Sequence, residues 1–398
     1  MSDNGDLARA RSLFPHTAQG KVYLNHAGTG PLSTAVVGAV GGYLRERSEG
    51  RIETYGEDLR MLAEVKNLVA RLIGAESPGR IALTPSTSDA LNIVAAGIPW
   101  REGDTVLVNT AEFPANVWPW LNLGRLGVRA VFLPCPDGRI TIDRVLDSLT
   151  PRTRVVALSA VQYLSGYRAD LATIGEICRS RGIIFVVDAI QAVGAVCLHV
   201  QRMKIDALAA GGQKWQMAPH GTGFLYITEE LQSILQQKSV GWLGVQDPWD
   251  FHNFAQDLAP DARRYEGGSP SIPALWGMRA ALTTLLEFGP DRVERRVLDL
   301  AGTLRGHLSG LGGVTVATPA EAAERAGIVT VRLPGRTDLA SVFKDLVHDR
   351  ILPAMRDEML RFSPHFYCTE EEMHSAAEAL RQALLRHTHE GPRPFIPS

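Results

Sequence analysis

Two residues with reactive side chains, Asp188 and Lys214, follow apolar runs of the sequence. Asp188 directly follows the apolar run "IIFVV". Lys214 follows "ALAAGGQ" and has no carboxylate beside it in sequence. A carboxylate at the mouth of a buried strand costs free energy unless a cationic or hydrogen-bonding group meets it. Taken alone, Asp188 is better explained as the N-cap of the next helix. With Lys214 at the end of the next apolar run, a shared chemical role is the stronger interpretation.

The two side chains together suit pyridoxal phosphate. Its aldehyde forms a Schiff base with a lysine amine, and its ring nitrogen stays protonated when an aspartate pairs with it. Its phosphate needs hydroxyl and N–H donors, which Ser86, Thr87 and Ser88 offer where a strand turns into a helix. The sequence therefore predicts pyridoxal phosphate as the cofactor.

Two further segments offer parts of such a site. Phe113, in "NTAEFPANVWPW", could cover the flat face of the cofactor, although an aromatic residue there is more commonly part of the core. Gly268 and Ser269, in "YEGGSPSIPALW", are candidate phosphate donors at a second glycine-rich helix start. The alternative for this second segment is an ordinary loop.

The elements that must position these residues alternate along the chain. From about residue 81 to 230, short apolar runs alternate with helical patterns, which is typical of a mostly parallel sheet covered by helices. Ligands of such sheets bind outside the carboxyl ends of the strands, where Asp188 and Lys214 stand. We expect an α/β large domain over 21–285, a smaller α+β domain over 286–398, and an N-terminal segment over 1–20 that joins them.

Composition limits the partners of the chain. Its 398 residues carry 41 Lys plus Arg against 43 Asp plus Glu, and the absence of a basic stripe argues against nucleic acid or a membrane surface. A small molecule is the expected ligand. Four scattered cysteines without CxxC spacing favour reduced thiols over disulfides or a metal site. With no signal-like start and no spanning apolar run, we expect a cytoplasmic protein.

The segments "VVDAIQAVGA" and "AAGGQKWQMAPHGTGFLY" resemble the signature of the class V aminotransferase family. This group of fold type I pyridoxal phosphate enzymes includes cysteine desulfurases, isopenicillin N epimerase-like proteins, kynureninase and several C–S lyases. The resemblance runs from "YLNHAGTGPLS" to "LRFSPHFYCTEEEM". It implies a large domain with a seven-stranded type of sheet, a small C-terminal domain, and a homodimer whose subunits share each active site.

The resemblance also implies roles for individual residues. Lys214 resembles the Schiff-base lysine, and Asp188 the partner of the pyridine nitrogen. The other implied cofactor contacts are Gln191 at the ring hydroxyl, Thr87, Ser88 and Gln213 at the phosphate, and Gly268 and Ser269 at the phosphate of the other protomer. Arg361 resembles the arginine that clamps the substrate α-carboxylate, and Asn25 is a further implied substrate-binding residue.

Three departures from the family narrow the function. Phe113 replaces the ring-stacking His of the desulfurases, so acid–base work is left chiefly to Lys214. The Asn that assists the carboxylate clamp is absent, and Ser159 or Gln162 is expected to do polar work there. Desulfurases carry a nucleophilic cysteine on a loop before the clamp arginine, but "HDRILPAMRDEMLRFS" has none, and Cys368 does not match that position.

The sequence therefore predicts an enzyme that uses pyridoxal phosphate to act at Cα or Cβ of an amino acid. The expected reaction is that of a lyase, epimerase or aminotransferase rather than a persulfide-forming desulfurase. A cysteine desulfurase is the alternative. A non-catalytic binding protein of the same fold is a further alternative, which the presence of Lys214 disfavours.

Overall fold

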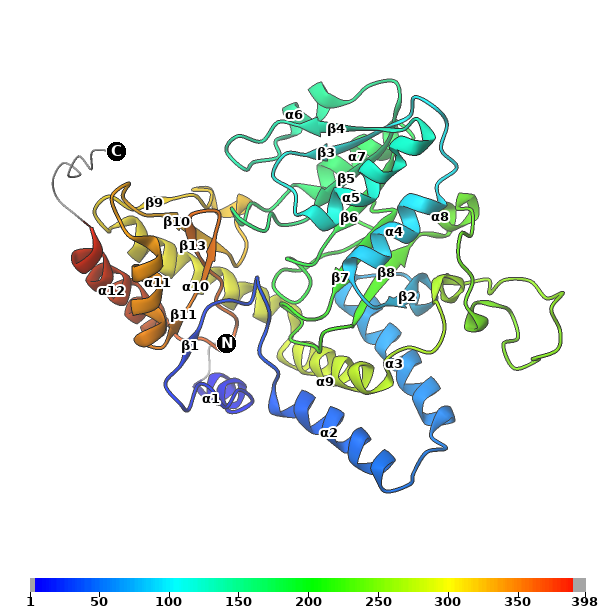
Figure 1. Cartoon of the computed structure of the whole chain (residues 1–398), viewed down its shortest axis with the longest axis horizontal. Coiled ribbons are helices and arrows are strands. Elements are labelled where there is room, and N and C mark those ends of the chain that lie inside the picture. The colour runs from blue at the N-terminus through cyan, green and yellow to red at the C-terminus, as the bar shows by residue number, and fades with distance from the viewer. Residues whose placement is uncertain (1–3, 389–398) are drawn as a thin grey trace, which may run out of the picture.

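A seven-stranded sheet forms the centre of the larger part of the molecule (Figure 1). The computed structural model describes residues 4–388. The strands are β2 (Ile81–Thr84), β3 (Thr105–Asn109), β4 (Arg129–Leu133), β5 (Thr153–Ser159), β6 (Ile184–Asp188), β7 (Ala207–Gly211) and β8 (Gly223–Ile227). Their order is β2-β8-β7-β6-β5-β3-β4, and β8 alone runs opposite to the other six strands. The predicted α/β fold with a mostly parallel sheet is confirmed.

Side chains on the two faces of this sheet enter two separate hydrophobic clusters. Along β5, Val156 and Leu158 belong to one cluster, whereas Val155 and Ala157 belong to the other. This alternation follows from the two-residue period of a strand, and both faces are apolar because helices cover both. The helices of this part are α2 (Thr34–Ser48), α3 (Tyr55–Ile73), α4 (Thr87–Gly97), α5 (Trp118–Leu121), α6 (Ile142–Ser148), α7 (Leu171–Ser180), α8 (Glu229–Ile234) and α9 (Ile272–Phe288).

The smaller part is built on a four-stranded antiparallel sheet (Figure 1). Its strands lie in the order β12 (Ala354–Arg356), β13 (Met359–Phe362), β10 (Val329–Arg332) and β9 (Thr315–Val316). Its helices are α10 (Pro290–Ser309), α11 (Leu339–His348) and α12 (Glu370–His387). Helix α9 continues across the predicted domain boundary, and residues 389–398 of the predicted small domain lie outside the described residues.

Residues 4–25 at the N-terminal end lie against the smaller part. After α1 (Asn4–Ser12), strand β1 (Val22–Tyr23) pairs in parallel with β11 (Ile351–Leu352), and Asn25 forms a bridge with Ser363. This pairing brings Asn25 next to the end of β13, the strand that carries Arg361. Among the helices of residues 4–388, none has the length and apolar character needed to cross a membrane.

Candidate active site

Asp188 is the last residue of the central strand β6 and is only 2% exposed. Its Oδ1 accepts the backbone N–H of Ile190 at 3.0 Å, while its Oδ2 is buried and has no hydrogen-bond partner among the described residues. A buried carboxylate oxygen without a donor is costly. The vacant acceptor therefore fits the protonated ring nitrogen of pyridoxal phosphate.

Lys214 follows the adjacent strand β7, and close backbone packing holds its loop. The N–H of Gly30 donates to the carbonyl of Gln213 at 2.8 Å. A Cβ atom at Gly30 would lie 2.2 Å from the carbonyl oxygen of Lys214, so only glycine fits this approach. The Lys214 Nζ lies 5.4 Å from the centroid of the Phe113 ring. The fold thus brings together the predicted lysine and the predicted stacking residue.

Burial shifts the protonation of both reactive groups. It raises the pKa of Asp188 to about 6, which the Ile190 N–H and Lys214 partly oppose. Burial lowers the pKa of Lys214 to about 8, against the attraction of Asp188 and with added repulsion from Arg361 and Arg356. A lysine with a depressed pKa has a larger fraction of neutral amine, the form that attacks carbonyls and accepts protons.

Polar groups gather where β7 ends and α4 begins. The Thr87 Oγ1 is buried without a partner among the described residues, and Ser88 is exposed beside it. A Cβ atom at Gly211 would lie 2.5 Å from the Gln213 Oε1 and 3.3 Å from the Thr87 Oγ1. The first N–H groups of α4 have no partner within the helix. Hydroxyl, amide and N–H donors around a glycine therefore fit the phosphate of the cofactor.

Arg361 lies on β13 and is 2% exposed. Its Nη1 donates to the carbonyl of Tyr163 at 2.7 Å, and its Nε is buried without a partner among the described residues. Burial lowers the pKa of Arg361 to about 10, with repulsion from Arg356 as the next cause. Because no carboxylate of the described residues forms an ion pair with it, the guanidinium can receive one from a ligand.

Asn25 belongs to residues 22–30, a stretch that pairs with the end of β13 and, through Gly30, contacts the loop of Lys214. Its backbone bridges Ser363, and its Oδ1 is buried without a hydrogen-bond partner among residues 4–388. A Cβ atom at Gly28 would lie 2.5 Å from this oxygen. Its predicted contact with the substrate remains a prediction.

Tyr163 is a residue of this region that the sequence did not reveal. Its carbonyl accepts from Arg361, its ring packs edge-on against Phe113 at 5.3 Å, and its hydroxyl donates to the Asp357 Oδ2 at 3.1 Å. No pattern in the sequence distinguishes this tyrosine, because its partners are far away along the chain. The predicted polar helpers Ser159 and Gln162 instead donate to Glu112, another residue not predicted.

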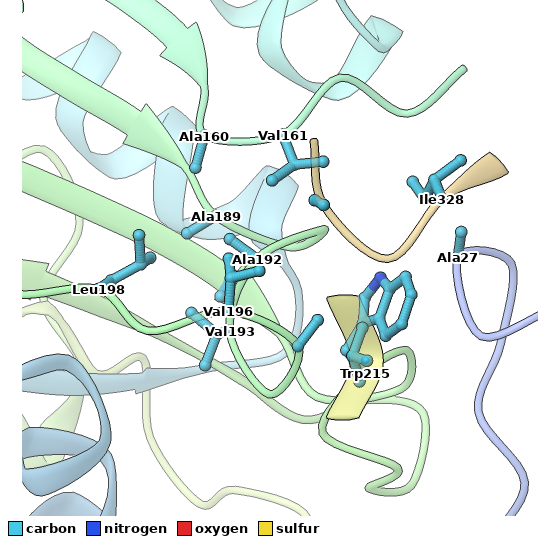
Figure 2. Close-up of a cluster of buried hydrophobic side chains, with 14 of the residues drawn as sticks. Ala27, Ala160, Val161, Ala189, Ala192, Val193, Val196, Leu198, Trp215 and Ile328 are labelled. Atoms are coloured by element: carbon cyan, nitrogen blue, oxygen red, sulfur yellow. The ribbon is translucent and has the colours of Figure 1, made fainter. Parts of the chain in front are cut away.

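Gln191 forms hydrogen bonds that hold the loop after Lys214 against the N-terminal residues. Its Nε2 donates to the carbonyl of Ala27 at 3.0 Å, and its Oε1 accepts the indole N–H of Trp215 at 2.8 Å. Figure 2 shows Trp215 in a buried cluster near Ala27 and Ile328. His365 Nε2 donates to the carbonyl of Trp215 at 2.9 Å, since its Nδ1 accepts the Phe366 N–H. The predicted contact of Gln191 with the cofactor hydroxyl remains a prediction.

Gly268 and Ser269 line a different cavity of about 770 Å³. Thr84, Pro85 and Asp89 also line it, whereas Lys214 and Asp188 are absent from its described lining. Within one chain, these two candidate phosphate donors therefore do not share a described cavity with Asp188 and Lys214.

The strand-end Asp–Lys pair on this mostly parallel sheet fits a pyridoxal phosphate-dependent enzyme of fold type I. The family model named Aminotransferase class-V matches residues 22–350, and the chain belongs to that family. The predicted family, the predicted enzyme and the predicted cofactor are thereby confirmed.

Several known proteins are similar over nearly the whole chain. Isopenicillin N epimerase of Streptomyces clavuligerus is 30% identical over 94% of this chain and 96% of its own. A probable cysteine desulfurase of Methanothermobacter thermautotrophicus is 28% identical over 91% and 94%. The apo structure of cysteine desulfurase from Thermococcus onnurineus superposes with a TM-score of 0.86, at 25% identity, over 97% and 99%. The cystine C–S lyase C-DES, at 23% identity over 92% and 99%, shares the fold with a TM-score of 0.84.

Proposed function

We propose that this enzyme acts at Cα or Cβ of an amino acid as a lyase, epimerase or aminotransferase, and that it does not form a persulfide on a cysteine. The observation that carries the proposal is the connection between β12 and β13, directly before Arg361. Only Asp357 and Glu358 join the two strands, and their φ angles are 45° and 59°. This is the tight two-residue hairpin of type I′. It has no room for a loop that could carry a thiol to the substrate.

The four cysteines support the same proposal. Cys368, the one nearest to Arg361 in sequence, is 1% exposed, and burial raises its pKa to about 12. Cys135 and Cys178 are also buried. Cys197 is partly exposed, but its thiol donates to Asp291, and burial and nearby carboxylates raise its pKa well above the ordinary value. A thiol that stays protonated is a poor acceptor of sulfur.

The proposed roles follow from the geometry around the cofactor site. When bound, pyridoxal phosphate supplies an electron sink for charge that develops at the substrate Cα. Asp188 would hold the protonated ring nitrogen, and Thr87, Ser88 and Gln213 the phosphate. Arg361, with Asn25 nearby, would clamp the substrate carboxylate. The neutral amine of Lys214 would take the Cα proton and return it, because Phe113 cannot carry one.

We further propose a homodimer in which each subunit completes the site of the other. Gly268 and Ser269 are the candidates for this exchange. They line a cavity whose described lining does not include Lys214 of their own chain. In this arrangement they would donate to the phosphate held by the partner subunit.

A cysteine desulfurase remains the second candidate, because curated relatives carry that name, including the probable enzyme of Methanothermobacter and CsdA of Escherichia coli, which is 30% identical over 72% of this chain. The two candidates leave different products from cysteine or cystine. Loss of sulfur by β-elimination yields pyruvate and ammonia, whereas transfer of sulfur to a thiolate leaves alanine.

The experiment quantifies alanine and pyruvate after incubation with cysteine, cystine and cysteine sulfoxide conjugates. It compares the wild type with a variant in which all four cysteines are replaced by serine or alanine. We expect neither protein to form alanine as the main product. Any sulfur release should produce pyruvate, both in the wild type and in the variant without cysteines. Alanine as the main product, lost in the Cys368→Ala variant, would establish the desulfurase.

A further inference from the structure

A buried carboxyl group, that of Glu112, stands directly before Phe113 in the chain and is not explained by the roles above. It is 8% exposed and receives hydrogen bonds from two neighbouring strand ends. The backbone N–H of Ser159 donates to its Oε1 at 2.6 Å, and the Gln162 Nε2 donates to the same oxygen at 3.3 Å. Asn109 Nδ2 also donates to Oε1, and the Ser159 hydroxyl bonds Oε2. Glu112 thus links the end of β3 to the end of β5.

The link joins two segments that each contact a residue of the site. Phe113, whose ring lies beside the Lys214 amine, is the next residue after Glu112. Ser159 is the register partner of Asp188 on the adjacent strand β6, and the Ala160 N–H donates to the Asp188 carbonyl at 2.8 Å. A displacement of the Glu112 carboxyl group would therefore shift the stacking residue and the strand beside Asp188 together.

Two opposing effects set the pKa of Glu112, namely burial and hydrogen bonds from neutral donors. Burial raises the pKa of Glu112 to about 7, the Ser159 hydrogen bonds lower it, and Asp188 raises it further. Burial raises the pKa of the Cys135 thiol, which follows β4, and the charge of Glu112 adds to that increase. No described cation forms an ion pair with Glu112, whereas Asp188 has Lys214 nearby. Both the N–H and the hydroxyl of Ser159 donate to Glu112, so neutral donors rather than a cation hold this carboxyl group in place.

We propose that Glu112 is a positioning residue of the cofactor site: its hydrogen bonds tie β3 to β5, hold Phe113 beside Lys214 and keep Ser159 against Asp188. The residue does not touch the cofactor in this role. Its effect should therefore appear in how the cofactor is held and oriented, and not merely in the stability of the fold.

The test compares Glu112→Ala and Glu112→Gln, with Asp206→Ala as the matched control. A glutamine can still accept from Ser159 and Asn109 and can donate to the Ser159 hydroxyl. Asp206 also links neighbouring strands, since its Oδ2 accepts the Phe185 N–H at 2.8 Å, but it lies at the amino ends of β6 and β7, away from the carboxyl ends that carry the site. The measurements are the Kd for pyridoxal phosphate, the visible circular dichroism of the bound cofactor, and the urea midpoint.

We expect Glu112→Ala to weaken pyridoxal phosphate binding by roughly tenfold and to change the visible dichroism. Glu112→Gln should stay within about threefold of the wild type. Asp206→Ala should lower the urea midpoint without changing either cofactor signal. If Glu112→Ala does not fold, Glu112→Asp, whose shorter side chain cannot make the same link, replaces it with the same expectations. Wild-type cofactor signals in the folded variant, or equal losses in Asp206→Ala, would overturn the proposal.

Discussion

The charge of Asp188 should destabilise the protein as long as no cofactor is bound, and Asp188→Asn should relieve this cost. Burial raises the pKa of this carboxyl group from its ordinary value of 3.8 to about 6 in the folded chain. The folded state therefore holds the proton more tightly than the unfolded state does. The stability that this proton contributes is fully present below pH 4 and is lost as the pH rises through 6. The shift of roughly 2 pKa units corresponds to ~3 kcal/mol at pH 8.

The substitution also has a cost that does not depend on pH. The new amide can still accept from the Ile190 N–H through its oxygen, but its NH₂ group would stand where Asp188 Oδ2 has no described partner. A buried donor without a partner costs about 1–3 kcal/mol. Because this cost is the same at pH 5 and pH 8, the difference between the two pH values isolates the charge.

Urea unfolding of the cofactor-free protein at pH 5 and pH 8 measures this difference. The stability of Asp188→Asn relative to the wild type should rise by roughly 1–2 kcal/mol between the two pH values. The exposed Asp299 on α10 supplies a control, since Asp299→Asn removes a charge at the surface. With the cofactor bound, the same Asp188→Asn variant should lose several orders of magnitude in rate, because an unprotonated ring is a poorer electron sink.

An equal stability difference at pH 5 and pH 8 would refute the reasoning, because it would mean that the carboxylate is already satisfied in the free protein. A loss of activity smaller than about tenfold, or ~1.4 kcal/mol of barrier, would reduce Asp188 to an acceptor for the turn at Ile190.

Two further substitutions test the other site residues. Lys214→Ala should abolish the visible absorption band that borohydride bleaches, while far-ultraviolet circular dichroism stays close to the wild type, since the reaction needs the amine and the sheet does not; a retained band with retained turnover would move the reactive amine elsewhere. Arg361→Ala should raise the KM for the amino acid on the order of 100-fold and lower kcat less, because a carboxylate clamp acts in both the ground state and the transition state; unchanged spectral titration with amino acids would exclude Arg361 as the clamp.

The strands and the proximity of Asp188 and Lys214 were predictable because their causes are local in the sequence. Apolar runs of strand length predicted all seven strands of the large sheet, and parallel strands bring their carboxyl ends to one edge. Asp188 and Lys214 end up close together for this reason alone. The role of Arg361 was not predictable in this way, since it was assigned by resemblance to the family. The sequence alone predicts only a strand that carries one exposed charge. Its burial and its bond to Tyr163 depend on contacts between distant segments.

The sequence by itself determined the fold class and the cofactor, because strand periodicity and two strand-end side chains carry that information, and it also predicted Lys214 as the reactive amine. Only the tertiary structure decided how the site is supported. Glu112 and Tyr163 have no local signal, and their partners Ser159 and Arg361 come from other elements. Likewise, the sequence showed no cysteine before Arg361, but the left-handed turn at Asp357 and Glu358 decided that the strands meet without a loop. Contacts between distant segments are set by packing, and packing is a property of the folded chain as a whole.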